Sequence, residues 1–123
     1  MATGSGNGVF DGGLNAAENL TSAQYKVVKL NSTGIVLAGG TAGSRGILQN
    51  DPASGEPALV QYLGITKAVA AASIARGTFV TSNSTSQIAA STTANDDVIG
   101  FTLEPSVSAG DIIRMCLTGA SNY

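Results

Sequence analysis

The sequence predicts an all-β fold, a small β-barrel or sandwich of short antiparallel strands in two similar halves, with an extended N-terminal arm. Three observations lead to this prediction. From Gln24 onward, short runs rich in β-branched and aromatic residues alternate with turns built from Gly, Pro, Asn and Ser. A strand–turn–strand pattern occurs twice along the chain. The first 22 residues, by contrast, form a zone of different, glycine-rich composition.

The zone of residues 1–22 is expected to be the extended arm, followed by a β-barrel-like domain over residues 23–123. Five of the first thirteen residues are glycine, and such a segment lacks the apolar surface to fold alone. Val9, Phe10 and Leu14 are its isolated apolar side chains. Two interpretations remain open: a loose terminus, or an arm that docks on a neighbouring subunit.

The first strands are expected at residues 25–30 and 35–38, joined by a turn at residues 31–34, and at residues 46–49. A polar turn follows, in which Pro52 fixes one φ angle and Gly55 can adopt a positive φ. The next strand is expected from Pro57 to at least Thr66.

This strand contains the longest apolar run of the chain after the arm, at residues 58–65. Both alternations of the run are apolar, since leucine and isoleucine lie on one and alanine, valine and tyrosine on the other. We therefore expect a strand that is covered on both faces. The same strand is the first candidate for a contact between subunits, through Leu59, Gln61, Tyr62, Leu63 and Ile65.

Residues 67–76 allow two interpretations. Their alanine content favours a helix of one or two turns that ends at Gly77. The surrounding strands favour a continuation of the preceding strand to about Val69, followed by a tight passage to Gly77. We expect the second.

The remaining strands are expected at residues 79–82 and 87–90, joined by a turn through Asn83, and then at residues 98–103 and 111–117. Alternation within the third of these places Ile99, Phe101 and Leu103 on one face. Residues 118–123 are expected to form a small polar tail.

An internal similarity supports the two halves. Residues 46–56 resemble residues 100–111: each segment has a glycine, an apolar strand, a turn with proline, then glycine followed by a carboxylate. The Asn-Ser-Thr turns upstream repeat at a similar separation, roughly 52 to 55 residues. The structural turn residues predicted by this comparison are Pro52, Gly55, Glu56, Pro105, Gly110 and Asp111.

The composition predicts a protein whose surface is partly covered by a partner. Only 11% of the residues are charged, although 43% are hydrophobic, and so few charges solubilise a small monomer poorly. The net charge is −2 and the cations are scattered, which argues against a nucleic-acid partner. No apolar run is long enough for a membrane helix, so we expect no membrane partner.

The residue types needed for catalysis are missing or scattered. The chain has no histidine and a single cysteine, Cys116, so we predict no catalytic residues, no metal site and no cofactor. Glu56 and Asp111 are expected to accept hydrogen bonds from turn amides or to pair with cations such as Arg45 or Arg114. An enzyme would require a pocket around these carboxylates.

A longer pattern resembles a known family. It consists of Gly46, Ile47, Leu48, Gln49, Asn50, Pro52, Gly55, Glu56, Ala58, Val60, Gly64, Ile65 and Lys67, followed in order by Ile74, Ala75, Gly77, Val80, Gly100, Leu103, Glu104, Ala109, Gly110, Asp111 and Ile113. This pattern resembles the small capsid decoration (cement) proteins of tailed bacteriophages.

The resemblance implies a β-barrel-like protein that is made in the host cytoplasm and binds the major capsid protein on the outside of the mature head. Its implied function is to stabilise the shell against the pressure of packaged DNA. We expect a homo-oligomer, a trimer or alternatively a dimer, with Val9, Phe10 and Leu14 as a capsid-docking arm. The alternative is another virion module: a head-fibre base, a tail component or a carbohydrate-binding surface protein.

Overall fold

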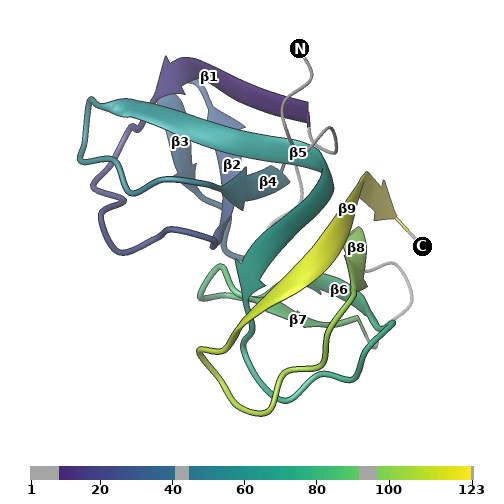
Figure 1. Ribbon diagram of the computed structural model, residues 1–123. Helices are drawn as coiled ribbons and strands as arrows, with labels where there is room; N and C mark the ends of the chain where they lie inside the picture. Colours follow the sequence, from purple (N-terminus) through teal and green to yellow (C-terminus); the bar gives the residue numbers. More distant parts are fainter. Residues whose placement is uncertain (1–8, 41–44, 92–96, 123) are drawn as a thin grey trace.

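The computed structural model describes residues 9–40, 45–91 and 97–122, and over these ranges it contains β-strands and no helix (Figure 1). The all-β prediction is confirmed. No helical segment in the described ranges has the length and hydropathy to span a bilayer. The nine strands are β1 (Val9–Asn15), β2 (Val27–Asn31), β3 (Gly34–Leu37), β4 (Arg45–Leu48), β5 (Pro57–Val69), β6 (Phe79–Ser82), β7 (Ile88–Ala90), β8 (Asp97–Thr102) and β9 (Ile112–Asn122).

The strands form one curled antiparallel sheet made of two halves with the same strand order. The order is β3-β2-β4-β5-β9-β8-β6-β7, with β1 also paired to β5. Read from each edge, β3-β2-β4-β5 and β7-β6-β8-β9 are the same arrangement, as the internal similarity predicts. We call β1–β4 with residues 57–63 the N-terminal half, and residues 64–69 with β6–β9 the C-terminal half.

The long strand β5 joins the halves. Its residues Val60 and Gln61 pair with β4, and its residues from Gly64 to Val69 pair with β9. Figure 1 shows β5 running along one half and bending into the other. Gly64 lies at this change of partner and has a φ of 94°, a backbone conformation that favours glycine.

The two Asn-Ser-Thr turns are held by similar hydrogen bonds, in which the asparagine side chain accepts two backbone N–H groups of its own turn. The Asn31 Oδ1 accepts the N–H groups of Thr33 at 2.9 Å and of Gly34 at 3.0 Å. The Asn83 Oδ1 accepts those of Thr85 and Gln87, each at 3.0 Å. These local bonds hold the hairpins β2–β3 and β6–β7.

The two proline turns also correspond. Gly55 and Gly110 have φ angles of 87° and 93°. The Glu56 Oε1 accepts the N–H of Ala53 at 2.8 Å, and the Asp111 Oδ2 accepts two turn N–H groups, of Val107 at 2.8 Å and Ser108 at 3.1 Å. Both carboxylates thus accept hydrogen bonds from amides of their own turns.

The hydrogen bonds from Val107 and Ser108 hold the pKa of Asp111 below its ordinary value of 3.8. A carboxyl group with a lowered folded-state pKa stabilises the fold above its unfolded-state pKa and loses that effect as the pH falls through the folded-state value. We expect Asp111→Asn to lower the melting temperature at pH 7, and the difference from wild type to shrink as the pH falls below the ordinary value of 3.8 and to vanish only below the lowered folded-state pKa. Thermal melts from pH 7 to pH 2 measure this, with Asp51→Asn in an exposed turn position as the control. An unchanged difference at all pH values would contradict the assignment.

The alanine-rich stretch is not helical. β5 continues to Val69, which pairs with Ile112, and Ala70 then forms an isolated parallel bridge with Ile88. Ala68 and Ala70 are completely buried. The prediction of a strand to Val69 followed by an irregular passage is confirmed.

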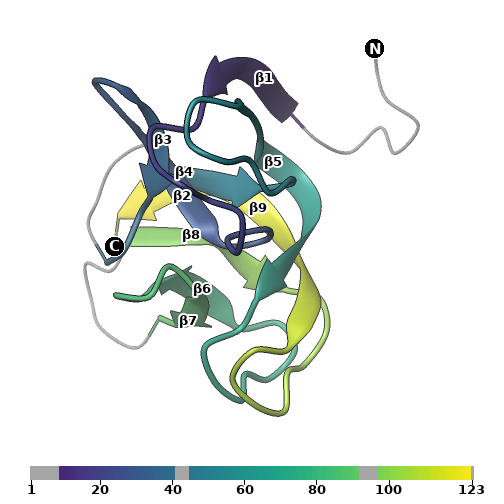
Figure 2. The ribbon, with the colours of Figure 1, turned by 90° about the vertical axis from the view of Figure 1, so that its left-hand side faces the viewer.

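Figure 2 shows the strands of the N-terminal half above β6 and β7 of the C-terminal half, and the buried side chains of the molecule form two clusters. The first lies between the halves and contains Val27, Ala38, Ile47, Ala68, Ala70, Ile74, Val80, Ile88, Ile99, Ile113, Met115 and Leu117. The second lies between the N-terminal half and the segment that precedes β2, and contains Ala16, Leu20, Ala23, Val28, Ile35, Leu48, Ala58 and Val60. Residues 9–22 thus belong to the same sheet and core as the domain, while residues 1–8 lie outside the described part.

Two local expectations are wrong. The polar tail is not separate, because β9 extends to Asn122 and pairs with β8 as far as Asp97. Ile99 does not share a face with Phe101, because the pairing shifts between Val98 and Gly100 and turns Ile99 into the first cluster.

Candidate interaction surface

The strand pairing aligns one row of side chains across each half. In the N-terminal half, Val27 is opposite Ile47, which is opposite Gln61. In the C-terminal half, the corresponding row runs Phe79, Phe101, Cys116 and then Ile65. The two rows occupy matching positions in the duplicated strand order, so their surroundings can be compared directly.

The row in the N-terminal half is buried. Val27 and Ile47 have no exposed surface and pack in the first cluster, against the C-terminal half. Gln61 is 2% exposed, and its Nε2 donates to the carbonyl oxygens of Leu63 and Ile65, both at 2.9 Å. Burial of this amide is tolerated because its donors are paired.

The row in the C-terminal half, which we call the outer row, faces solvent. Phe79 is 53% exposed and Ile65 is 42% exposed, while Phe101 and Cys116 are half-buried. The Phe79 and Phe101 rings form an edge-to-face pair with centroids 6.5 Å apart. The same kind of row is therefore core in one half and surface in the other.

Cations border the outer row. Lys67 is opposite Arg114 in the pairing of β5 with β9, next to the Ile65–Cys116 pair. The Arg114 Nε lies 3.2 Å from the Glu104 Oε2, and its backbone N–H donates to the Glu104 Oε1 at 3.0 Å. This backbone hydrogen bond, together with the guanidinium and the nearby Arg76, lowers the pKa of Glu104. The Glu104 carboxylate thus interacts with two arginines, Arg114 and Arg76, while the Lys67 ammonium lies 6.0 Å from the centroid of the Tyr25 ring.

The structure separates the five candidate interface residues of β5. Leu59, Leu63 and Ile65 are exposed, each by about two fifths, whereas Gln61 is buried and Tyr62 packs against the second cluster. Leu59, Leu63 and Ile65 are the large apolar side chains of this strand that the rest of the chain leaves exposed. Cover on both faces would therefore require another subunit and stays a prediction.

The candidate arm residues are placed only in part. β1 pairs antiparallel with β5 of the same chain, with Val9 opposite Leu63 and Phe10 opposite Gln61. The side chains of Val9 and Phe10 lie outside the described part. Leu14 packs against the second cluster of its own chain. Docking of this segment on another protein stays a prediction.

Sequence reasoning missed the aromatic pair. Phe79 and Phe101 correspond to Val27 and Ile47 when the internal similarity is extended through the strand pairing. The available signal was that these two positions hold phenylalanine where the equivalent positions of the other half hold aliphatic residues. The sequence does not tell which of the two rows is buried, so this signal could not be interpreted.

The described residues contain no arrangement that resembles a catalytic centre. Within them, no group of three or more His, Cys, Asp or Glu side chains is placed to hold a metal ion. Glu56 and Asp111, the carboxylates that an enzyme would need, accept hydrogen bonds from their own turns. Their geometry is explained by the fold.

Known proteins resemble this β-domain in fold and in sequence. No curated protein matches the chain. The solved structure of the N base of the head fibre gp8.5 of bacteriophage phi29 is similar, with a TM-score of 0.65 and 14% sequence identity. The match covers 94% of this chain and 98% of that one, and at this identity it shows a shared fold. A family model described as "phage cement protein" matches residues 7–117, nearly the whole sequence. The chain belongs to the phage cement protein family.

Proposed function

We propose that this protein binds the outer surface of the mature phage head, through the major capsid protein, and stabilises the shell against the pressure of packaged DNA. The observation that carries the proposal is the family match over residues 7–117. The low charge content and the exposed apolar row support it, because both are properties of a surface that a partner covers. The protein would be made in the host cytoplasm and act in the virion.

The stabilisation follows from mass action. A protein that binds the expanded lattice and not the precursor or the dissociated coat subunits lowers the free energy of the expanded lattice by its own binding free energy. An oligomer that touches several coat subunits adds avidity. We propose a homo-oligomer, a trimer or a dimer, in which the exposed residues Leu59, Leu63 and Ile65 contribute to subunit contacts.

The test uses heads that lack this protein. Purified protein should co-sediment with expanded heads and not with precursor shells, and should raise the temperature at which the heads release DNA. Heads incubated with bovine albumin are the control. Failure to co-sediment with expanded heads would contradict the proposal. Deletion of residues 2–15 tests the arm and should weaken attachment to heads. Its melting curve must be recorded alongside, because β1 is part of the sheet.

A second candidate function is that of a base for a larger surface appendage. The similarity to a head-fibre base supports it, since nearly the whole of that chain is matched. Localisation on intact particles by electron microscopy distinguishes the two. Density that ends at the shell surface fits decoration, and density that continues outward from this domain fits a fibre base.

A further inference from the structure

The C-terminal half presents one face of its sheet to solvent. Burial alternates along β9: Ile113, Met115 and Leu117 are buried, and the side chains between them are exposed or half-buried. The buried side is a wall of the first cluster. The opposite side, which we call the outer face, carries Phe79, Phe101, Leu103, Ile112, Arg114 and Cys116.

The outer face is apolar where a solvated strand face is ordinarily polar. Phe79 and Ile112 are 53% and 54% exposed, and Phe101, Leu103 and Cys116 are half-buried. The strand pairing makes these side chains neighbours, since Phe79 is opposite Phe101, which is opposite Cys116, and the Leu103 N–H donates to the backbone of β9 at 3.0 Å. Single exposed apolar side chains are ordinary, but a contiguous apolar patch indicates a binding surface.

The N-terminal half shows what such a face does when it is covered. The equivalent positions there are Val27 and Ile47, and both are buried where the C-terminal half packs on them. The same face of the duplicated sheet is thus a packing surface in one half. The outer face offers this kind of contact to a partner outside the chain.

A second copy of this chain cannot continue the stack in the same way. It would have to present either the sheet face that its C-terminal half turns to the first cluster or the equivalent face of its N-terminal half. The former is buried between the halves. The latter, which carries Leu48 and Val60, is covered by the segment that contains Leu20. Continuation of the stack therefore needs a different protein.

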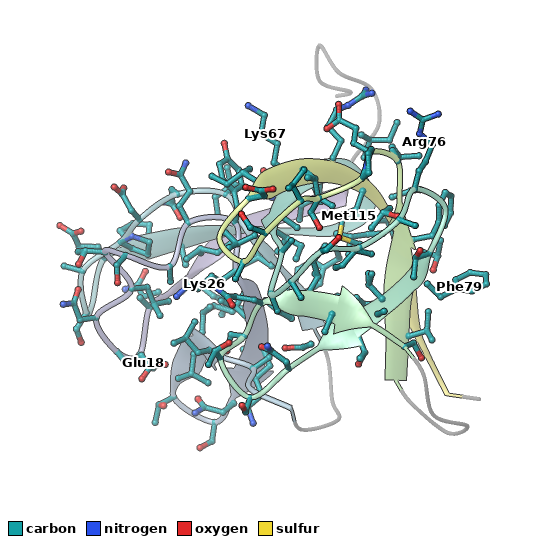
Figure 3. The ribbon with its side chains drawn as sticks, turned by 90° about the horizontal axis from the view of Figure 1, so that it is seen from below. Glu18, Lys26, Lys67, Arg76, Phe79 and Met115 are labelled. Carbon is teal, nitrogen blue, oxygen red and sulfur yellow. The ribbon has the colours of Figure 1, made fainter. Side chains whose placement is uncertain are left out.

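Two arginines border the outer face. The Arg114 Nε lies 3.2 Å from the Glu104 Oε2, and the exposed Arg76 interacts electrostatically with the same carboxylate. In Figure 3, the Phe79 side chain points away from the molecule on the side where Arg76 lies, and Met115 lies inside. Two cations that share one carboxylate leave this border positive. The positive border opposes contact between the outer faces of two copies and favours a carboxylate on the partner.

We propose that the outer face docks on a ridge of the major capsid protein that presents apolar side chains beside a carboxylate. This inference rests on the proposed function, and it adds which face meets the shell and what chemistry that face takes. Phe79 and Phe101 form the apolar centre of the contact, and Arg76 and Arg114 lie at its polar rim, the usual anatomy of an interface.

Phe79→Ser tests the apolar centre, with Leu30→Ser as the matched control. Leu30 is similarly exposed, at 45%, but lies on β2 in the N-terminal half. We expect the Phe79 variant to bind expanded heads about tenfold more weakly than wild type, and the Leu30 variant to bind like wild type. Co-sedimentation over a concentration series gives the affinities. Circular dichroism and thermal melts verify that both variants are folded.

Arg76→Glu tests the charge at the rim. We expect it to weaken binding to expanded heads about fivefold at low salt, and the difference from wild type to shrink as the salt concentration rises. Lys29→Glu is the control, because it changes the net charge equally but lies on β2 of the other half. Equal weakening by the two variants would attribute the effect to net charge and contradict a carboxylate at this rim.

Cys116 reports directly whether the outer face is covered. It is the only cysteine of the sequence and lies opposite Phe101. Its alkylation by iodoacetamide, followed by mass spectrometry of the peptide, should be several times slower in protein bound to expanded heads than in free protein. The rate in free protein should not change over a concentration series in which the protein self-associates.

The outcomes separate this inference from the proposed function. If wild type binds heads, a Phe79 variant of equal affinity or a Cys116 thiol that stays equally reactive on heads overturns the inference alone. A Phe79 variant that loses self-association, or a Cys116 rate that falls with the concentration of free protein, assigns the outer face to subunit contacts and overturns the inference as well. Wild-type protein that ignores expanded heads contradicts the proposed function and this inference together.

Discussion

Gly100→Ala is expected to destabilise the fold by about 3 kcal/mol or more, because β8 and β9 approach each other too closely there for a side chain. A Cβ atom on Gly100 would collide with the carbonyl oxygen of Cys116 and would lie 2.8 Å from the Met115 Cε. The methionine can move, but the carbonyl oxygen belongs to the paired backbone of β9. Relief of the clash therefore requires the two strands to separate.

The duplicated architecture supplies the controls for this prediction. Gly46 is the equivalent position in β4, where a Cβ would lie 2.6 Å from the Gln61 carbonyl oxygen, and Gly46→Ala should be similarly severe. Gly55→Ala meets nothing within 4 Å and should cost only the strain of a positive φ, about 1 kcal/mol. Urea unfolding gives the free energies. Equal stability of the Gly100 and Gly55 variants would show that the strands are not held this closely.

Ile47→Ala is the second large expected effect, a loss of about 3 kcal/mol in the free energy of unfolding. Ile47 is fully buried at the centre of its row and packs between the halves. Its truncation therefore leaves a cavity between the halves, and the cavity can be filled only if one half moves relative to the other. Chemical denaturation and a melting curve are the measurements.

Phe101→Ala is the matched control, since Phe101 occupies the corresponding position of the outer row. It is half-buried, and its removal should cost about 1 kcal/mol of folding stability. Comparison of the Ile47→Ala and Phe101→Ala variants distinguishes a core side chain from a surface side chain at equivalent positions of the two halves. A Phe101 variant less stable than the Ile47 variant would contradict the layer assignment.

The turns were predictable from sequence because their determinants are local. Asn31 and Asn83 bond amides within four residues, and Glu56 and Asp111 bond amides just before them. The alanine-rich stretch was also resolved correctly, since the β context outweighed a helix propensity worth only tenths of a kcal/mol per residue.

The layers were not predictable in the same way. Apolar residues on both alternations of β5 indicated burial on both faces, but the pattern cannot tell whether the cover comes from the same chain. Gln61 is buried and Leu63 exposed, the reverse of their polarity, because the other half of the molecule covers only part of the strand. Likewise, the glycine-rich composition of residues 1–22 predicted an extended arm, although Leu20 is a core residue that is 1% exposed.

The stacking of the two halves makes this protein comparable to a very short repeat protein. In such proteins each unit covers the next, and a dedicated terminal unit with a polar outer side protects the last apolar face. The segment around Leu20 acts as that terminal cap for the N-terminal half. The C-terminal half ends the array without a cap in the described chain. A stack of two like units capped at one end has a direction, and its open end is the outer face of the C-terminal half.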